Sequence, residues 1–178
     1  IKITSPLIKI QEKKNSYFIK GQFLNDRKNF DVAELRSILI NLPDNINIKK
    51  IEFSSKNDFS FNINKNFKID NFKVKSILNL KKLIFSKKNL KLNVYLPNFV
   101  EEIKLTDHKT IINYNKKKFN IKGNGNILLG EKSDGFFYQI IKDKNNLLFD
   151  LEIKLKNNSL LIDFLDYEKK EGLDSIVL

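Results

Sequence analysis

Residues 147–155 alternate between apolar and mostly charged side chains, and this alternation constrains the fold more than any other feature. The apolar set is Leu147, Phe149, Leu151, Ile153 and Leu155. Because a β-strand turns successive side chains to opposite faces, the pattern predicts a strand with one apolar face. A second apolar run, 160–165, follows the turn-like residues 157–159. The two runs are therefore predicted to pair as a hairpin.

The same two-faced pattern recurs along most of the chain and predicts one strand after another. The predicted strands are 1–10, 17–24, 45–53, 58–63, 66–76, 83–85, 90–97, 100–105, 110–114, 119–129 and 136–141, followed by the hairpin and one more strand in the tail. The connections are short and contain Asn, Asp, Lys and Gly, which favours an antiparallel meander. A change of alternation across Pro6 predicts an edge strand with a bulge, and a similar slip predicts a bulge near Asp70 and Asn71.

One helix is predicted, at about residues 31–42. Asp31 can cap it, with Glu34 in capping-box spacing, and Pro43 ends it. Its apolar stripe is Val32, Leu35, Ile38, Leu39 and Leu42. A helix of this length can cover only one end of a sheet. Residues 1–178 are thus predicted to form a single all-β segment, mainly antiparallel with one short helix, and the absence of methionine suggests a segment of a longer protein.

Composition argues against several kinds of chemistry. The chain has no cysteine, so it can form neither a disulfide nor a thiolate metal site. His108 is the single histidine and lies in LTDHKT, which predicts a surface position in a polar turn. No nucleophile, phosphate-binding or metal-binding motif is present. We therefore expect no catalytic residue, no metal and no cofactor, and a protein that is not an enzyme.

The net charge of +12 raises the possibility of a nucleic-acid partner. However, only Arg27 and Arg36 are arginines, and arginine supplies the fork that reads phosphates and base edges. Abundant Lys, Asn, Ile and Phe with scarce Ala, Gly, Pro and Arg is also the bias that AT-rich codons produce. We favour a solvated lysine face and expect no nucleic-acid partner.

Residues 119–129 contain two glycines in an otherwise apolar alternation. Phe119, Ile121, Gly123, Gly125, Ile127 and Leu129 fall on one face. Glycine inside a strand weakens it and often marks a bend or the close approach of another group. The glycines could form a plain turn between two short strands. Alternatively, one bent strand could leave room for a ligand on its concave side.

The apolar face needs something to cover it, because burying each Leu, Ile or Phe is worth about 1.5–3 kcal/mol. One solution is a closed, sandwich-like fold in which two sheets cover each other. Another is an open, curved sheet whose hollow accepts lipid acyl chains. The sequence pattern alone leaves both possibilities open.

The order of elements resembles the AsmA-like family of bacterial envelope proteins, which includes TamB-type relatives. The resemblance is carried by FDVAELRSILINLPDNINIKKIEFSS, by FNINKNFKIDNFKVKS, and by FNIKGNGNILLG through LLIDFLDYEKKEG. It implies an open β-groove that shields phospholipid acyl chains between the inner and outer membranes. It also implies a periplasmic location, attachment to the inner membrane through a part of the chain outside this sequence, and neighbouring β segments of the same chain as partners.

The family has no catalytic residues, so the resemblance implies lipid contacts only. They would come from the apolar face: Phe119, Ile121, Gly123, Gly125, Ile127, Leu129, Leu147, Phe149, Leu151, Ile153 and Leu155. The main hypothesis is a lipid-binding and lipid-transporting groove segment. The alternative is a structural, sandwich-like module of an envelope or surface protein without a ligand. A basic nucleic-acid-binding domain is less favoured.

Overall fold

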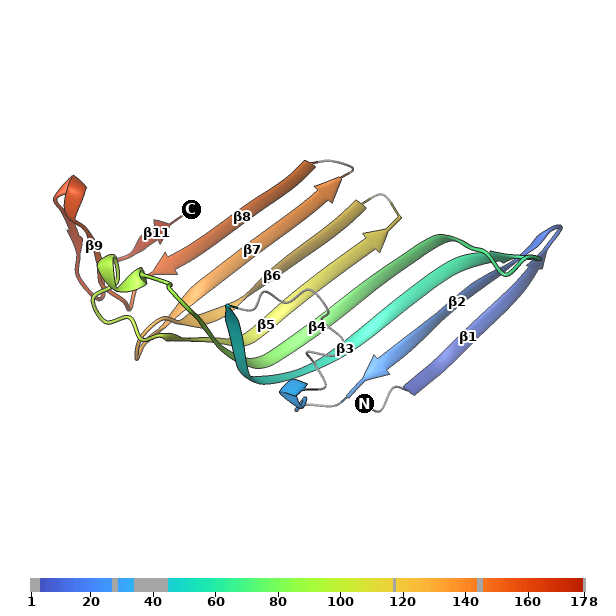
Figure 1. Cartoon of the computed structure of the whole chain (residues 1–178), viewed down its shortest axis with the longest axis horizontal. Coiled ribbons are helices and arrows are strands. Elements are labelled where there is room, and N and C mark those ends of the chain that lie inside the picture. Colours follow the sequence, from blue (N-terminus) through green and yellow to red (C-terminus); the bar gives the residue numbers. More distant parts are fainter. Residues whose placement is uncertain (1–3, 27–28, 34–44, 117, 144–145, 178) are drawn as a thin grey trace.

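The computed structural model describes residues 4–26, 29–33, 45–116, 118–143 and 146–177. Nine strands form one antiparallel sheet in the order β1-β2-β3-β4-β5-β6-β7-β8-β11, and β9 pairs with β10 alone. The bounds are β1 Thr4–Lys13, β2 Ser16–Asn25, β3 Ile46–Asn64, β4 Ile69–Lys87, β5 Glu102–Asn115, β6 Lys118–Leu128, β7 Ser133–Asp143, β8 Asn146–Leu155, β9 Leu160–Ile162, β10 Tyr167–Lys169 and β11 Ser175–Val177. The predicted antiparallel meander is confirmed (Figure 1).

Several strands predicted separately are continuous. Strands β3 and β4 each run for 19 residues, and β5 joins the two weak strands predicted around 100–105 and 110–114. The register shifts at Lys81 of β4 and at Asp107 of β5, within the gaps between the predicted pieces of these two strands. Each bulge adds one residue, so the strand continues while its alternation changes face.

The prediction of a strand at 90–97 is wrong. This segment is a loop with a 3-10 helix, η1 (Leu92–Val94), in which the Leu96 N–H donates to the Leu92 carbonyl. Its apolar side chains pack on the face of the sheet: Leu90, Leu92, Leu96 and Phe99. Alternating apolar residues indicate that side chains are buried on one side of the segment. A loop that folds over the sheet can bury them as well as a strand can.

The hairpin predicted from 147–155 and 160–165 is also wrong. Strand β9 pairs with β10, and residues 163–165 form a second 3-10 helix, η2 (Asp163–Leu165). Strand β8 instead pairs with β7 and with β11, the additional strand expected in the tail. The turn at 156–158 is held by Asp134 of β7, which directs the chain away from β8.

Both predicted bulges are confirmed. The pairing of β1 with β2 shifts between Thr4 and Leu7, on either side of Pro6, and β1 is an edge strand. The pairing of β3 with β4 shifts opposite Asn71, whose φ is 52°. At the predicted helix, the Ala33 N–H donates to Asp31 Oδ1 at 2.8 Å, as expected of a capping residue. The rest of that helix, from Glu34 onward, lies outside the described residues.

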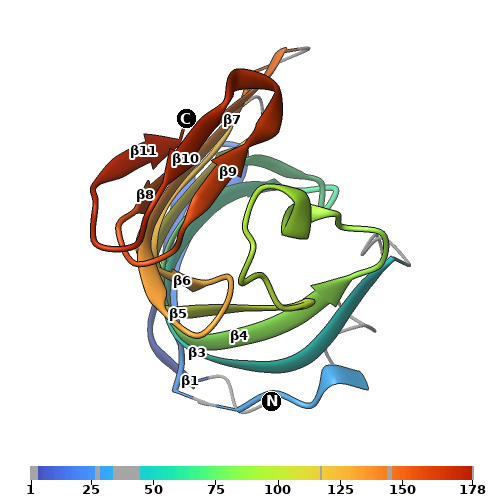
Figure 2. The ribbon, with the colours of Figure 1, turned by 90° about the vertical axis from the view of Figure 1, so that its left-hand side faces the viewer.

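The sheet curves into a trough rather than lying flat (Figure 2). Two irregularities lie side by side at its centre, where Lys81 is an extra residue of β4 against β3 and Asp107 an extra residue of β5 against β6. Asp107 has a φ of 53°, and its carboxylate pairs with Lys81 Nζ at 2.8 Å. Because a bulge bends its strand and increases the local twist, adjacent bulges explain why the middle strands bend together.

The two ends of the trough differ, and the loop 88–101 lies within its curve at one of them (Figure 2). At this end, which we call the capped end, the loop and β9 cover the concave face. The buried cluster is Leu96, Ile103, Ile127, Leu129, Leu155 and Leu160. The open end is the opposite one, where β1, β3, β5 and β7 end and β2, β4, β6 and β8 begin. In the described part of the chain, the second sheet is the two-stranded β9–β10 at the capped end, which is too small to close over the trough, so the sandwich-like alternative is not the fold.

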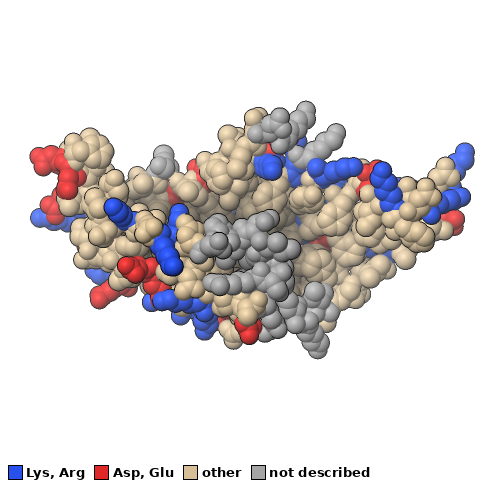
Figure 3. Space-filling model, viewed as in Figure 1, with Lys and Arg blue, Asp and Glu red and all other residues tan. Residues whose placement is uncertain are grey.

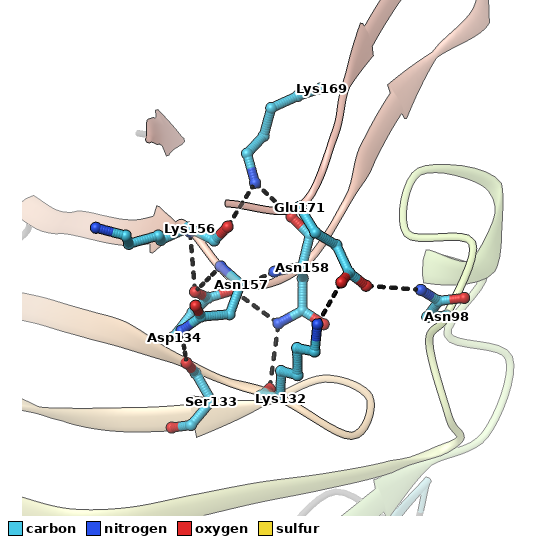
Figure 4. A network of polar contacts seen from close by, with 9 residues as sticks. All are labelled: Asn98, Lys132, Ser133, Asp134, Lys156, Asn157, Asn158, Lys169 and Glu171. Atoms are coloured by element: carbon cyan, nitrogen blue, oxygen red, sulfur yellow. Dashed lines mark hydrogen bonds and ion pairs between the residues drawn. The ribbon is translucent and has the colours of Figure 1, made fainter. Parts of the chain in front are cut away.

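A polar network holds the chain at the capped end (Figure 4). Asp134 is buried, and its carboxylate accepts hydrogen bonds from the successive N–H groups of Lys156, Asn157 and Asn158 at 2.8–3.2 Å. The Asn158 amide also donates to Asp134 Oδ2 at 2.7 Å. Buried Lys169 donates to the carbonyls of Lys156 and Asn158 at 3.2 and 2.5 Å. One carboxylate thus fixes the turn that leads into β9 and β10.

No helix in the described residues is long and apolar enough to cross a bilayer.

We expect Asp134→Ala to lower the free energy of unfolding by about 2–4 kcal/mol, because it leaves buried N–H groups without an acceptor. Denaturant titration followed by circular dichroism measures this change. Asp150→Ala is the control, since Asp150 is exposed on β8. Equal stability of the two variants would contradict the role assigned to Asp134.

Candidate functional site

The residues predicted to line a groove do share one face. Across β6, β7 and β8, Gly123 pairs with Tyr138 and Tyr138 with Leu151, while Ile121 pairs with Ile140 and Ile140 with Phe149. Paired residues in a sheet point to the same side. Their face is the concave one, because the loop 88–101 packs on it at Ile127 and Leu155.

The predicted set divides between the two ends of the trough. Ile127, Leu129 and Leu155 belong to the buried cluster of the capped end. Leu147, Phe149 and Leu151 are exposed on the concave face towards the open end. Exposed Phe149 and its exposed neighbour Leu148 lie on opposite faces of β8, since Phe149 pairs with Ile140 and Leu148 with Ile141. Only the residues of the open end are accessible to a ligand.

Sequence reasoning missed much of the open end. An aromatic cluster crosses β2 to β5 there, with successive ring centroids 6.0–6.3 Å apart, and its members are Phe23, Phe59, Phe61, Phe72 and Tyr114. Exposed apolar residues continue on the same face: Ile8, Ile10, Tyr17 and Ile69. Alternation already placed Phe59 and Phe61 together. That Phe72 lies on the same face could not be predicted, because it depends on how β3 and β4 pair across the bulge at Asn71.

The two glycines lie within one continuous strand, β6, so the interpretation as a plain turn is wrong. The space they leave is filled by side chains of neighbouring strands. A Cβ atom on Gly123 would lie 2.4 Å from Tyr138 Cζ, and one on Gly125 would lie 2.3 Å from His108 Cδ2. The glycines therefore permit close approach of two rings, and the described side chains occupy the room that a ligand was expected to use.

His108 is buried, so the prediction of a surface position is wrong. It lies in β5 with 1% of its surface exposed, and its ring contacts the rings of Phe136 and Tyr138. Its Nε2 is 2.9 Å from the Asn126 carbonyl, which can only accept, so Nε2 carries the proton. Burial lowers the pKa of His108. The imidazole is therefore a neutral part of the packed floor. Its neighbours Asp107 and Lys109 are polar, which is why the sequence predicted a turn.

Polar side chains cross the concave face between its two halves. Asn57, Ser76 and Thr110 are buried there. The Asn57 amide donates to the Phe23 carbonyl at 3.3 Å and to Ser55 Oγ at 3.0 Å, and Thr110 Oγ1 lies 2.6 Å from the Tyr138 hydroxyl. These hydrogen bonds satisfy polar groups that could not otherwise be buried at low cost. The trough thus has an apolar open half, a polar row and a packed capped end.

The opposite face carries lysines. A shallow depression of about 630 Å³ across β1 to β5 is lined by Lys9, Lys20, Lys73 and Lys75. Asp58 lies among them and accepts a hydrogen bond from Gln22 at 2.7 Å. The lysines stand on adjacent strands with their ammonium groups in solvent, which agrees with a solvated basic face. Among the described residues no three His, Asp or Glu side chains gather in a way that could hold a metal ion.

Comparisons with protein-family models, with curated proteins and with solved structures found no match to this chain. The concave face is therefore interpreted from its own geometry.

Gly125→Ala should destabilise the fold by about 2 kcal/mol or more, since the added methyl group overlaps the His108 ring in a packed site. Gly135→Ala is a matched control in β7, because its Cβ would meet nothing nearer than 3.6 Å. It should change stability by less than about 1 kcal/mol. Thermal unfolding of both variants measures the difference, and equal effects would contradict the packing described for β6.

His108 should make stability depend on pH. Its pKa is lowered in the folded state, so below about pH 6.5, the value of an unfolded histidine, acid favours the unfolded chain. The contribution of His108 to the free energy of unfolding is fully present above that pH. It is lost as the pH falls below it, by at most about 1.4 kcal/mol per pH unit. Urea unfolding between pH 7.5 and 5.5 should show this slope, and His108→Phe should remove it. An unchanged slope in the variant would contradict the assignment.

Proposed function

We propose that the concave face at the open end binds phospholipid acyl chains, and that the chain is a non-enzymatic lipid-binding segment of a β-groove. The observation that carries the proposal is a continuous set of exposed apolar side chains on one face of a strongly charged protein. They come from both halves of the sheet, with Ile10, Tyr17 and Ile69 on one side and Leu147, Phe149 and Leu151 on the other. Monomeric soluble proteins rarely leave such a surface without a function.

The dimensions of the open half suit this ligand. The apolar face of β2 runs from Tyr17 to Phe23, a rise of six residue steps or about 20 Å. One leaflet of a bilayer contributes about 15 Å of hydrocarbon, half of the membrane core. An acyl chain lying along the strands would contact the aromatic cluster and end near the polar row at Asn57 and Thr110. The lysines that border the trough can attract anionic headgroups.

The resemblance to AsmA-like proteins supports the same proposal and extends it. In such a protein the groove would lie in the periplasm and conduct phospholipid between the inner and outer membranes. The polar row makes the apolar floor discontinuous, however. Passage of lipid along the whole length of this segment would therefore bring its acyl chains past Asn57, Ser76 and Thr110.

A structural module without a ligand is the second candidate function. The capped end favours it, because Leu96, Ile127 and Leu155 form an ordinary dry core there. In this case another protein segment would cover the open half. Co-purifying lipid separates the two candidates, since only the groove binds phospholipid by itself.

Native mass spectrometry of the chain purified from bacteria should show bound phospholipid. Phe149→Asp should reduce the bound fraction at least about tenfold, because it places a charge among acyl chains. Leu148→Asp is the control: both side chains are 62% exposed, but Leu148 lies on the opposite face. Both variants should fold, as judged by circular dichroism. Lipid-free wild-type protein, or equal loss in both variants, would contradict the proposal.

A further inference from the structure

The β3–β4 turn at the open end holds an aromatic residue out in solvent. Phe67 is 83% exposed and has a φ of 57°, in the left-handed region that aromatic residues rarely adopt. The turn is firmly built around Asn64. The Asn64 side chain accepts from the N–H groups of Asn66 and Lys68 at 3.0 and 2.9 Å, and its carbonyl accepts from the Phe67 N–H at 2.9 Å.

Phe67 is unfavourable here for stability on two counts. Its ring remains in water, and its backbone adopts a conformation that Asn or Gly would adopt with much less strain. Residues held in such strained conformations by well-ordered surroundings are often functional. Exposure and strain are independent observations, and both indicate that the ring is needed outside the fold.

Lysines surround this aromatic tip. Lys65 and Lys68 belong to the same turn. Lys13 at the end of β1 and Lys14 in the β1–β2 turn lie next to it, because Ser16 pairs with Asn64. The acidic residues in or beside the two turns are Glu12 and Asp70, and Asp70 pairs with Lys116 at 3.4 Å. Basic side chains gather at this extremity of the molecule (Figure 3). The tip is therefore an aromatic ring within a net positive collar.

The tip leads directly into the trough. Ile69 follows the turn and is exposed on the concave face, where it pairs with Ile63, and Ile63 pairs with Tyr17. The β1–β2 and β3–β4 turns form one end of the long axis of the molecule, opposite the capped end (Figure 1). Whatever binds the tip therefore lies at the mouth of the apolar half.

We propose that this tip docks on an anionic lipid bilayer, with the Phe67 ring inserted at the headgroup–acyl boundary and Lys13, Lys14, Lys65 and Lys68 near the lipid phosphates. A protruding ring with flexible cations around it suits a deformable, negatively charged surface, where aromatic rings and lysines are both stabilised. Lysine acts as a point charge without the geometric demands of arginine, which fits binding to many phosphates rather than to one shaped site.

Co-sedimentation with vesicles tests the proposal. The wild-type chain should bind phosphatidylcholine vesicles that contain phosphatidylglycerol, should bind pure phosphatidylcholine weakly, and should lose affinity as salt is added. Phe67→Asn should weaken binding about tenfold, since it removes the inserted ring. The thermal midpoint of this variant should be unchanged or higher, because Asn tolerates the left-handed backbone. Lys65→Glu with Lys68→Glu should weaken binding at least as much.

Matched variants at the capped end serve as controls. Phe164→Asn removes a ring that is 79% exposed in η2, and Lys87→Glu with Lys88→Glu reverses two exposed charges at the end of β4. Neither should change vesicle binding. Equal binding by Phe67→Asn and wild type would overturn the proposal, as would equal losses at both ends. A dimer that Phe67→Asn dissociates, without vesicle binding, would show that a second copy occupies the tip and would also overturn it.

This docking is distinguishable from acyl-chain binding in the trough. Phe67→Asn should keep its co-purified lipid while losing vesicle binding, and Phe149→Asp should do the reverse. Failure of one proposal therefore leaves the other intact.

Discussion

The curvature of the sheet depends on the row of irregular pairs at its centre. There the strands must bend together, and they do so because Lys81 and Asp107 are extra residues in adjacent strands. Gly125 faces two residues of β5 at this point, and its missing side chain lets the His108 ring lie against β6. A flat sheet with the same apolar side chains would expose that whole face to solvent. A bent one produces a trough that the short loop 88–101 can cover at one end.

The alternation of side chains predicted most of the architecture. The all-β class, the meander, the edge position of β1 and the bulges at Pro6 and Asn71 all follow from local patterns, because each depends on neighbours in sequence. The pairing of β9 could not be predicted in this way. It depends on Asp134, which lies more than twenty residues away in the sequence. The Asp134 carboxylate accepts hydrogen bonds from the turn at 156–158, and these direct the chain away from β8.

The candidate site shows the same division between local and long-range information. Leu147, Phe149 and Leu151 could be placed on one face because they alternate within one strand. Their exposure could not be predicted, since it depends on how far the loop 88–101 reaches along the trough. His108 was misplaced for the same reason. Asp107 and Lys109 indicate a polar turn when read locally, but a bulge lets β5 continue and turns the imidazole towards Gly125.

The difference between the ends gives the trough a direction. At the capped end apolar residues are buried by the chain itself and polar groups are satisfied by Asp134 and Lys169. At the open end apolar residues remain exposed, and the turn at Phe67 retains strain that Asn at this position would largely relieve. Selection for stability alone would remove both features. Their occurrence together at one end, beside the lysines, is what an apolar trough requires if its contents come from a membrane surface.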